Sequence, residues 1–395
     1  MFQHVVLKQL QNIADGKFGL ERENLRVTAS GRLAMTPHPK TLGDKCCNPE
    51  ITTDFSESQI EIVSPAVSSV EALLPEISRI NAKVKKGLED EYLWMQSVPP
   101  CHLPPEDKIP LAQFGVPGDV IYEKTEYRMY LAAKYGSYKQ LYSGIHFNFS
   151  FDEDQLNELL SLEQRNDFYI RLMAQALKYR YFLTFTLAAS PKTINGTTYR
   201  SARLGKEGYH NTQPILLDYS DTASYLCSLK KVIDSGVIEG SRELYELVRA
   251  KGTNMDEFNS LKAEINRIEL RLPDLNPFYP DGINPADLYV MHLYIKWCSG
   301  LINDSYTDEE QLIASQLSFE ASELDLTVAV EHKIKAIFDA LFVYLENAGL
   351  PSIYHQSLLE AYDRFLYPKK RYAEKLLHAY SESSFEQFNL EHSIK

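Results

Sequence analysis

The chain has 395 residues, of which 44% are hydrophobic, so it has enough apolar material to bury a large core. Its formal net charge of −13 disfavours a general nucleic-acid-binding surface, although ATP can still bind where Mg²⁺ and local Arg or Lys supply positive charge. Five irregularly spaced cysteines favour a reduced cytoplasmic compartment over a disulfide framework or a zinc site. No apolar run of about 18 residues predicts a membrane span, and the first residues lack the features of a signal peptide.

Apolar periodicity and turn residues predict helices along most of the chain. In chain order the expected helices are 2–15, 70–92, 126–134, a mostly helical stretch 153–189 broken once or twice, 222–233, 286–298, 328–348, 356–367 and 370–380. A loop is expected over 190–199. No linker rich in Gly, Ser or Pro interrupts the chain, so we expect one mixed domain. Strands in the first two-thirds and helices in the last third predict an α+β fold, with a sheet backed by helices.

Four segments alternate apolar and polar residues with the period of a strand, so that successive side chains point to opposite faces. They are residues 19–23, 57–62, 145–151 and 267–272. Their polar positions are Glu21 and Glu23; Glu57, Gln59 and Glu61; His146, Asn148 and Ser150; and Arg267, Glu269 and Arg271. Carboxylates that converge on one sheet face repel unless a cation holds them. The pattern therefore predicts a metal and phosphate site, although a solvated charged face explains any single segment more simply.

Asp54 is a further candidate ligand with an awkward position. It differs from Glu61 by an odd number of residues, so a regular strand would send the two side chains to opposite faces. Either a bulge intervenes or Asp54 lies in the loop that enters the strand. Several carboxylates and a histidine, His146, form an oxygen-rich ligand set that favours Mg²⁺ or Mn²⁺ over zinc.

Arginine residues near the alternating segments are candidates for binding phosphate or carboxylate groups. Arg271 lies two residues after Glu269, and its planar guanidinium can bind two oxygens at once. The other candidates are Arg128, Arg200, Arg203 and Arg249, for each of which surface solubility is an equally good explanation. His146 can ligate a metal, donate to a phosphate or serve as a structural histidine. A Gly-rich P-loop and a Gly-x-Ser-x-Gly elbow are both absent from the sequence, which excludes these two classes of site.

The combined segments closely resemble one enzyme family. They are GLERENLRV (19–27), ITTDFSESQIE (51–61), SGIHFNFS (143–150), and RIELR (267–271) followed by DLNPF (274–278). In this order they are similar to bacterial glutamate–cysteine ligases, including the ligase module of bifunctional glutathione-synthesising enzymes. The resemblance covers roughly 19–300, whereas 301–395 resembles the family only loosely. It implies a single catalytic domain over 1–395, with the motif-bearing core at 19–300 and a helical part at 301–395.

The resemblance implies a fold and an activity. The fold would be a funnel-shaped antiparallel β-sheet related to glutamine synthetase, with helices behind it. The activity would be ATP- and Mg²⁺-dependent joining of the L-glutamate γ-carboxylate to the amine of L-cysteine through γ-glutamyl phosphate, the first step of glutathione biosynthesis. The expected partners are these small molecules alone, without nucleic acid or membrane, for a cytoplasmic monomer.

The resemblance also assigns roles to residues of this sequence. The metal-site residues would be Glu21, Asp54, Glu61, His146 and Glu269. His146 would also lie near phosphate, and Arg271 would contact the transferring phosphate, which makes these two the expected catalytic residues. The acceptor pocket would be formed by Tyr127, Leu131, Gln140, Tyr209 and Tyr245, and Arg128 and Arg203 would face substrate carboxylates.

Three features of the sequence differ from the family pattern. Tyr142 precedes the SGIH segment where relatives often have a smaller aliphatic residue, Leu272-Pro273 replaces a more polar pair, and the chain is shortened between Ala189 and Tyr209. These differences leave the amine acceptor open between cysteine and another amine. A non-catalytic nucleotide-binding homologue is a further alternative.

Overall fold

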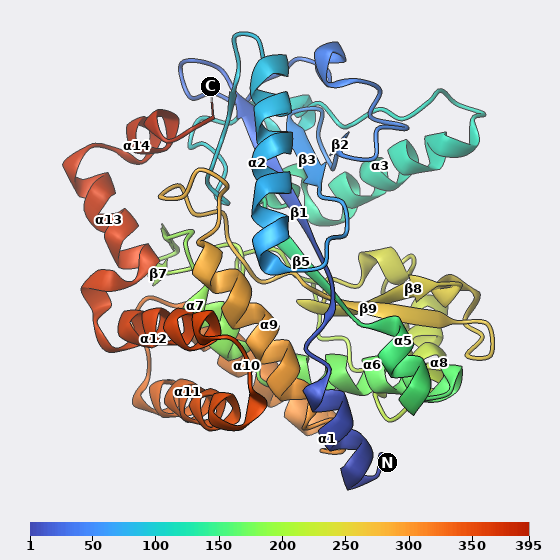
Figure 1. The fold of residues 1–395 in the computed structure, drawn as a ribbon. Helices are drawn as coiled ribbons and strands as arrows, with labels where there is room; N and C mark the ends of the chain where they lie inside the picture. The colour runs from blue at the N-terminus through green and yellow to red at the C-terminus, as the bar shows by residue number, and fades with distance from the viewer. Residues whose placement is uncertain (395) are drawn as a thin grey trace.

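The computed structural model describes residues 1–394, and its helices and strands form the arrangement shown in Figure 1. The strands are β1 (Gly16–Val27), β2 (Ile51–Thr53), β3 (Gln59–Val63), β4 (Tyr92–Leu93), β5 (Ile145–Phe151), β6 (Lys192–Ile194), β7 (Thr197–Tyr199), β8 (Val248–Thr253) and β9 (Glu264–Leu270). The α-helices are α1 (His4–Asn12), α2 (Val70–Gly87), α3 (Glu123–Tyr135), α4 (Ser137–Gln140), α5 (Glu153–Leu159), α6 (Leu162–Lys178), α7 (Tyr181–Thr186), α8 (Thr222–Asp234), α9 (Pro285–Ser299), α10 (Asp308–Ser322), α11 (Val328–Ala348), α12 (Ser352–Leu366), α13 (Tyr372–Glu382) and α14 (Phe385–Glu391).

One curled antiparallel sheet organises the chain. Its strands follow the order β2-β3-β1-β5-β9-β8, and β4 pairs separately with β1. Helices α2, α6 and α9 cover one face of this sheet, and α10, α11 and α12 lie beyond them (Figure 1). Helices α13 and α14 run along one edge of the molecule and lead the chain back to β4 (Figure 1). The predicted α+β fold, an antiparallel sheet backed by helices, is confirmed. No helix within residues 1–394 combines the length and the apolar character that a membrane crossing requires.

The two faces of β1 differ because its side chains alternate. Phe18 and Leu20 are buried on the helix-covered face. His292 of α9 packs there, with its ring centroid 4.9 Å from that of Phe18 and 4.4 Å from that of Phe149. Glu21 lies on the opposite face, which the covering helices leave open. The apolar half of the alternation therefore fixes which side of the sheet faces the core.

Buried polar groups anchor α2 to the same face of β1. Arg22 is fully buried, and its Nη2 donates to Asn81 Oδ1 of α2 at 2.6 Å. Its Nε donates to Asn24 Oδ1 at 2.6 Å, and its Nη1 donates to the Asp281 carbonyl oxygen at 2.8 Å. These bonds satisfy a guanidinium that would otherwise be costly to bury.

Several local predictions need correction. Residues 153–189 contain two breaks and three helices, as the sequence allowed, but 190–199 forms the hairpin β6–β7 rather than a plain loop. Strand β8 and helices α10 and α14 were not predicted. Helix α10 carries a capping box, Thr307 with Glu310, which is a readable start signal. Strand β8 contains Gly252 beside a register shift, which weakens its alternation.

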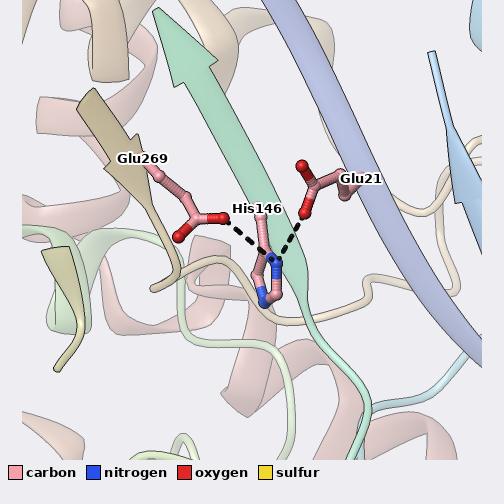
Figure 2. A group of neighbouring side chains, drawn as sticks. All are labelled: Glu21, His146 and Glu269. Carbon is pink, nitrogen blue, oxygen red and sulfur yellow. Dashed lines mark hydrogen bonds and ion pairs between the residues drawn. The ribbon is translucent and has the colours of Figure 1, made fainter. Parts of the chain in front are cut away.

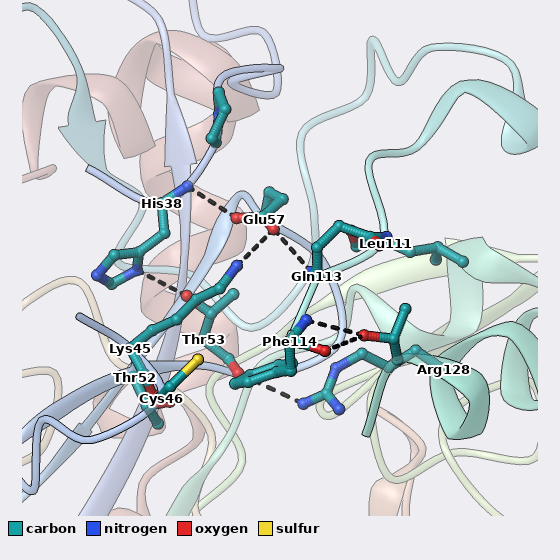
Figure 3. A network of polar contacts seen from close by, with 12 residues as sticks. His38, Lys45, Cys46, Thr52, Thr53, Glu57, Leu111, Gln113, Phe114 and Arg128 are labelled. Atoms are coloured by element: carbon teal, nitrogen blue, oxygen red, sulfur yellow. Dashed lines mark hydrogen bonds and ion pairs between the residues drawn. The ribbon is translucent and has the colours of Figure 1, made fainter. Parts of the chain in front are cut away.

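Glu57 was predicted to share the charged face of the second alternating segment, and this prediction is wrong. Strand β3 begins at Gln59, so Glu57 lies in the preceding turn. Its carboxylate accepts the backbone amides of His38 at 2.7 Å and Gln113 at 2.8 Å, and it pairs with Lys45 (Figure 3). Glu57 therefore holds two loops together. It does not lie on the open face of the sheet that carries Glu21, Glu61, His146 and Glu269, which is called the acidic face below.

Candidate active site

The register of the central strands brings the charged residues together. Glu21 lies opposite His146 between β1 and β5, and Glu23 lies opposite Glu61 between β1 and β3. Glu269 of β9 lies opposite Asn148 of β5, which follows His146 by two residues. As Figure 2 shows, the three side chains meet on one face: His146 Nδ1 is 3.2 Å from Glu21 Oε2 and 3.8 Å from Glu269 Oε1.

The cluster of Glu21, His146 and Glu269 has the composition of a divalent-metal site. One ligand atom from each residue lies within 4.8 Å of the others. Glu269 Oε2 is buried and has no hydrogen-bond partner within residues 1–394, which is an uncommon state for a carboxylate oxygen. Two carboxylates and one imidazole suit Mg²⁺ or Mn²⁺, and a carboxylate oxygen that accepts no hydrogen bond fits a ligand to such an ion.

The carboxylates of the acidic face differ in the direction in which their pKa values are shifted. Burial opposes the ionisation of Glu269, but the positive charges of Arg271 and Lys251 lower its pKa to about 2. Burial and the carboxylate of Asp54 raise the pKa of Glu23 to about 6. Burial also raises the pKa of Glu61 well above its ordinary value. The face therefore carries more carboxylates than it can keep ionised by itself, and a bound cation would relieve this repulsion.

Asp54 reaches this face because it lies in the turn between β2 and β3. The backbone amide of Asp54 donates to the Gln59 carbonyl oxygen at 3.0 Å, which closes the turn. Of the two alternatives that the sequence left open, a bulge and an entry loop, the structure shows the loop. Its odd separation from Glu61 therefore does not place it on the opposite face.

Two cavities border the acidic face. The outer one has a volume of ≈ 220 Å³, and the inner one has a volume of ≈ 20 Å³. The predicted residues that line the outer cavity are Glu21, Asp54, Glu61, Tyr127, Arg128, Leu131, Gln140, His146, Tyr209, Tyr245, Glu269 and Arg271. Arg203 lines the inner one. The structure thus gathers every predicted site residue around one region, while their individual roles stay predictions.

The guanidinium of Arg128 is occupied by the protein itself. Its Nε donates to the Asp54 carbonyl oxygen. Its Nη2 donates to the Thr53 carbonyl oxygen at 3.4 Å (Figure 3). Its Nη1 donates to the Lys124 carbonyl oxygen at 2.7 Å, and the group lies 4.5 Å from the centroid of the Phe114 ring. This arrangement positions the turn that carries Asp54.

Arg203 is occupied in the same way. Its Nε donates to Asp274 Oδ1 at 2.9 Å, and its Nη1 donates to the Arg271 carbonyl oxygen at 3.1 Å. Its Nη2 donates to the carbonyl oxygens of Leu272 at 2.7 Å and Pro273 at 2.8 Å. These bonds hold the segment that follows β9, and with it the backbone of Arg271.

The remaining arginine candidates differ in position. Arg200 donates to the carbonyl oxygens of Glu323 and Leu324, and it lines neither site cavity. Arg249 of β8 donates to the Ser241 carbonyl oxygen at 3.0 Å and also lies outside both lining sets. Among the arginine candidates, only Arg271 lines both cavities. It also lies beside a carboxylate, because its Nη1 is 3.8 Å from Glu269 Oε2.

The expected acceptor pocket is aromatic and contains unpartnered polar atoms. The ring centroids of Tyr209 and Tyr245 lie 4.3 Å apart. The hydroxyls of Tyr127 and Tyr245 and the side-chain nitrogen of Gln140 are buried without a hydrogen-bond partner within residues 1–394. Groups of this kind are available to bind a polar ligand.

Three residues of the site were not assigned a role from the sequence. Lys251 lies 3.8 Å from Glu269 Oε2, and it was missed because β8 was not predicted. Glu23 was placed on the charged face but not among the metal-site residues, yet its Oε1 lies 3.7 Å from His146 Nε2, and its Oε2 accepts the Gly144 amide at 3.1 Å. Glu246 lines the inner cavity and had no sequence signal of its own.

The sheet and its acidic face define an α+β protein with a candidate divalent-metal site. A family model described as glutamate-cysteine ligase matches residues 4–200 and 192–320. The chain therefore belongs to the glutamate–cysteine ligase family, which confirms the resemblance seen in the sequence.

Curated relatives carry the same family relationship. The chain is 37% identical over 342 residues to the glutathione biosynthesis bifunctional protein GshAB of Desulfotalea psychrophila, covering 79% of this chain and 42% of that protein. It is 33% identical over 421 residues to the protein of that name from Listeria innocua, covering 95% of this chain and 53% of that protein. The chain thus spans about half the length of the curated relatives it matches.

Solved structures have the same fold. A bifunctional glutathione synthetase from Pasteurella multocida matches with a TM-score of 0.89 and 29% identity, covering 99% of this chain and 54% of that one. A glutamate–cysteine ligase from Francisella tularensis in complex with AMP matches with a TM-score of 0.84 and 21% identity, covering 96% of this chain and 87% of that one. The second likeness supports the fold alone.

Proposed function

We propose that this chain joins the γ-carboxylate of L-glutamate to the amine of L-cysteine at the expense of ATP, the first step of glutathione biosynthesis. The observation that carries the proposal is the convergence of Glu21, His146 and Glu269 beside Arg271 on one sheet face. Family membership supplies the reaction to which this site is assigned. The proposed setting is a cytoplasmic enzyme that acts on small molecules.

The chemistry follows from the poor reactivity of a carboxylate towards an amine. In the first step a γ-carboxylate oxygen of glutamate bonds to the γ-phosphorus of ATP, and the bond to ADP breaks. In the second step the amine nitrogen bonds to the acyl carbon, phosphate leaves with the bond electrons, and the nitrogen loses a proton. A divalent cation, when bound, would neutralise charge on the phosphates.

The residues of the acidic face have distinct proposed parts in this reaction. Arg271 would bind the transferring phosphoryl group, because its guanidinium borders both cavities. Glu21, Asp54, Glu61, His146 and Glu269 would hold Mg²⁺ or Mn²⁺, and His146 would also lie near phosphate. Glu269 is suited to a ligand role since its low pKa keeps it ionised at neutral pH.

The acceptor amine is proposed to lie among Tyr127, Leu131, Gln140, Tyr209 and Tyr245. Arg128 and Arg203 are proposed to act near the substrate carboxylates mainly through the backbone they hold, because Arg128 already donates three hydrogen bonds and Arg203 four of the five that a guanidinium can make. A second candidate function is a γ-glutamyl ligase for another amine. Tyr142 favours it, because this bulky side chain lines the inner cavity.

A coupled assay of ADP release tests both functions. Purified protein would be given ATP, Mg²⁺, L-glutamate and either L-cysteine or one of a panel of other amines. We expect cysteine to give the highest kcat/KM. ADP release with other amines but not with cysteine would contradict the first function and support a γ-glutamyl ligase for another amine.

Two variants separate catalysis from a non-catalytic homologue. Glu269→Gln should lower kcat by at least about a hundredfold, because it removes a charged group at the proposed metal. Glu264→Gln, on the same strand but exposed, is the matched control and should retain activity. Equal activity in the two variants, or no activity in the parent protein with any amine, would overturn the catalytic assignment.

We further propose that residues 1–395 form one catalytic domain, with the motif-bearing core at 19–300. Ile394 pairs with Leu93 of β4, and α12 packs against α9, so the helical part contacts the core both in its middle and near its end. Expression of residues 1–300 alone tests this. We expect insoluble protein, whereas a folded and active fragment would show that the helical part is separate.

A further inference from the structure

A third cavity lies behind the wall formed by Tyr209 and Tyr245. Its volume is ≈ 190 Å³, and it is bordered by 209–216, by residues before β8 and by α10. It shares Tyr209 and Tyr245 with both site cavities, and Glu246 and Leu247 with the inner one. Pockets for drug-sized ligands have volumes of roughly 300 to 1,000 Å³, so this cavity suits a smaller molecule.

The cation of this cavity is Arg180, whose side chain is almost fully buried. Its Nη1 donates to the Leu177 carbonyl oxygen at 2.9 Å and to the Tyr306 hydroxyl at 3.1 Å. Its Nη2 donates to Ser315 Oγ at 2.6 Å. A guanidinium has five N–H groups, so two of them have no acceptor within residues 1–394. These two groups are available to an anion.

The anion of the cavity is Glu246, which stands between this cavity and the inner site cavity. The backbone amide of Leu247 is beside its carboxylate, and Arg180 and Arg249 act on it only through longer-range charge. Within residues 1–394 it forms no ion pair. The Glu246 side chain is only partly buried, and an ammonium group that enters the cavity would give its carboxylate the paired cation that it lacks.

The walls between the two charges are mostly apolar. Leu204, Ile215 and Phe319 contribute to them. A ligand that matches the cavity therefore carries an anionic group for Arg180, a cationic group for Glu246 and a short apolar part. A free α-amino acid with an aliphatic side chain has this composition. A simple amine or a simple carboxylic acid would pair with only one of these two charges.

We propose that this cavity is a second site, separate from the acidic face, that binds a free aliphatic α-amino acid through Arg180 and Glu246. The ligand would lie against the Tyr209–Tyr245 wall from the side opposite the acceptor pocket. The site is independent of the amine that the acceptor pocket takes, and its test requires binding alone.

Titration of the full chain with L-leucine, followed by ligand-detected NMR, tests the proposal. Two analogues are the chemical controls: 4-methylpentanoate lacks the ammonium group, and 3-methylbutan-1-amine lacks the carboxylate. We expect saturable binding of L-leucine and at least about tenfold weaker binding of each analogue, since each loses one charged contact. No saturable binding of leucine, or equal binding of all three compounds, would overturn the proposal.

Three variants localise the binding. Glu246→Gln should weaken L-leucine binding by about tenfold. Ile215→Trp should abolish it by filling the cavity, and Ile215 borders neither site cavity. Leu261→Trp, at a residue that is 85% exposed, controls for the added ring and should bind leucine as the parent does. Unchanged binding in both cavity variants would place leucine elsewhere and refute the proposed site.

Discussion

The hydroxyl of Tyr135 donates to Glu243 Oε1 at 2.6 Å, which ties helix α3 to the segment that precedes β8. Glu243 is fully buried and also accepts the Tyr130 hydroxyl at 2.9 Å and pairs with Lys134. Helix α3 carries two of the expected pocket residues, Tyr127 and Leu131, and Tyr245 lies two residues after Glu243. Glu243 thus fixes the two walls of the acceptor pocket relative to each other.

Replacement of Glu243 by alanine should therefore affect both stability and acceptor binding. Removal of the carboxylate leaves two tyrosine hydroxyls without this acceptor and breaks the ion pair of Lys134, which keeps only the Val237 carbonyl oxygen and the Tyr130 hydroxyl as acceptors. We expect a loss of about 3 kcal/mol in the free energy of unfolding. Urea denaturation measures this loss. The KM for the acceptor amine should rise more than the KM for ATP, because only the acceptor is proposed to contact these walls.

The control for Glu243→Ala is Glu239→Ala. The Glu239 side chain forms a surface pair with Arg242, three residues along the chain, and the bond from its backbone amide to Glu243 is kept in the alanine variant, so the substitution should cost less than about 1 kcal/mol. A similar small loss in Glu243→Ala would show that the buried network contributes little.

Glu61→Gln should stabilise the metal-free protein while it abolishes activity. Burial, then the carboxylates of Asp54 and Glu21, raise the pKa of Glu61 well above its ordinary value, so this residue destabilises the face when no cation is present. A neutral amide of similar shape relieves this repulsion, and we expect a gain of about 1 kcal/mol. Thermal unfolding in the presence of EDTA measures it.

The stability advantage of Glu61→Gln over the parent protein should be lost when metal is added. Excess Mg²⁺ or Mn²⁺ should raise the Tm of the parent protein, and it should raise that of Glu61→Gln by less. The exposed Glu264→Gln variant should match the parent under both conditions. A lower Tm for Glu61→Gln in EDTA would contradict the account of crowded carboxylates.

His292 should make the protein less stable as the pH falls below neutrality. Burial and the nearby Lys296 lower its pKa to about 3, so the folded state keeps this histidine neutral while the unfolded state takes up a proton below about pH 6.5. The unfolded state then binds more protons, and stability falls between about pH 6.5 and 3. From pH 7.5 to 5.0 this one group should cost about 2 kcal/mol.

Urea denaturation of the parent and of His292→Leu at these two pH values tests this dependence. The variant loses the 2.7 Å contact between His292 Nδ1 and the Tyr354 hydroxyl, so its absolute stability should be lower at pH 7.5. Its further loss on acidification should be smaller by about 2 kcal/mol, because leucine does not titrate. Parallel losses in the two proteins would assign the acid sensitivity to other groups.

The charged faces of the strands could be predicted because period-two alternation is a local property. Glu21, His146 and Glu269 alternate with apolar residues that pack against the helices, so their face follows from their neighbours in sequence. Which strands pair was not predictable in this way. The proximity of His146 to Glu21 depends on the β1–β5 register, which joins residues 125 positions apart.

The orientation of the arginines was not accessible from the sequence. The guanidinium of Arg203 donates to carbonyl oxygens of the segment after β9, about seventy residues away in the sequence. No local sequence pattern predicts that contact. Lys251 was missed for a different reason, because the register shift at Gly252 interrupts the alternation of its strand. Asp54 could be placed only as one of two alternatives, since turn geometry decides its direction.

Arg128→Lys should lower activity although it conserves the charge. The guanidinium bonds the carbonyl oxygens of Asp54, Thr53 and Lys124 through three different nitrogens, and a single ammonium group cannot reproduce this geometry. The turn that carries Asp54 should then move relative to the acidic face. Because a small misplacement of a site residue costs up to about a hundredfold in rate, we expect kcat/KM to fall by about tenfold to a hundredfold.

Steady-state kinetics of Arg128→Lys, with circular dichroism to confirm folding, measure this loss. Lys124→Ala is the matched control, because the Lys124 contact to Arg128 uses only its backbone carbonyl oxygen. Its side chain lies at 5.3 Å from the centroid of the Phe114 ring and holds no part of the Asp54 turn. Full activity in Arg128→Lys would mean that charge alone is required at position 128. That outcome would favour direct contact with a substrate carboxylate over support of the turn.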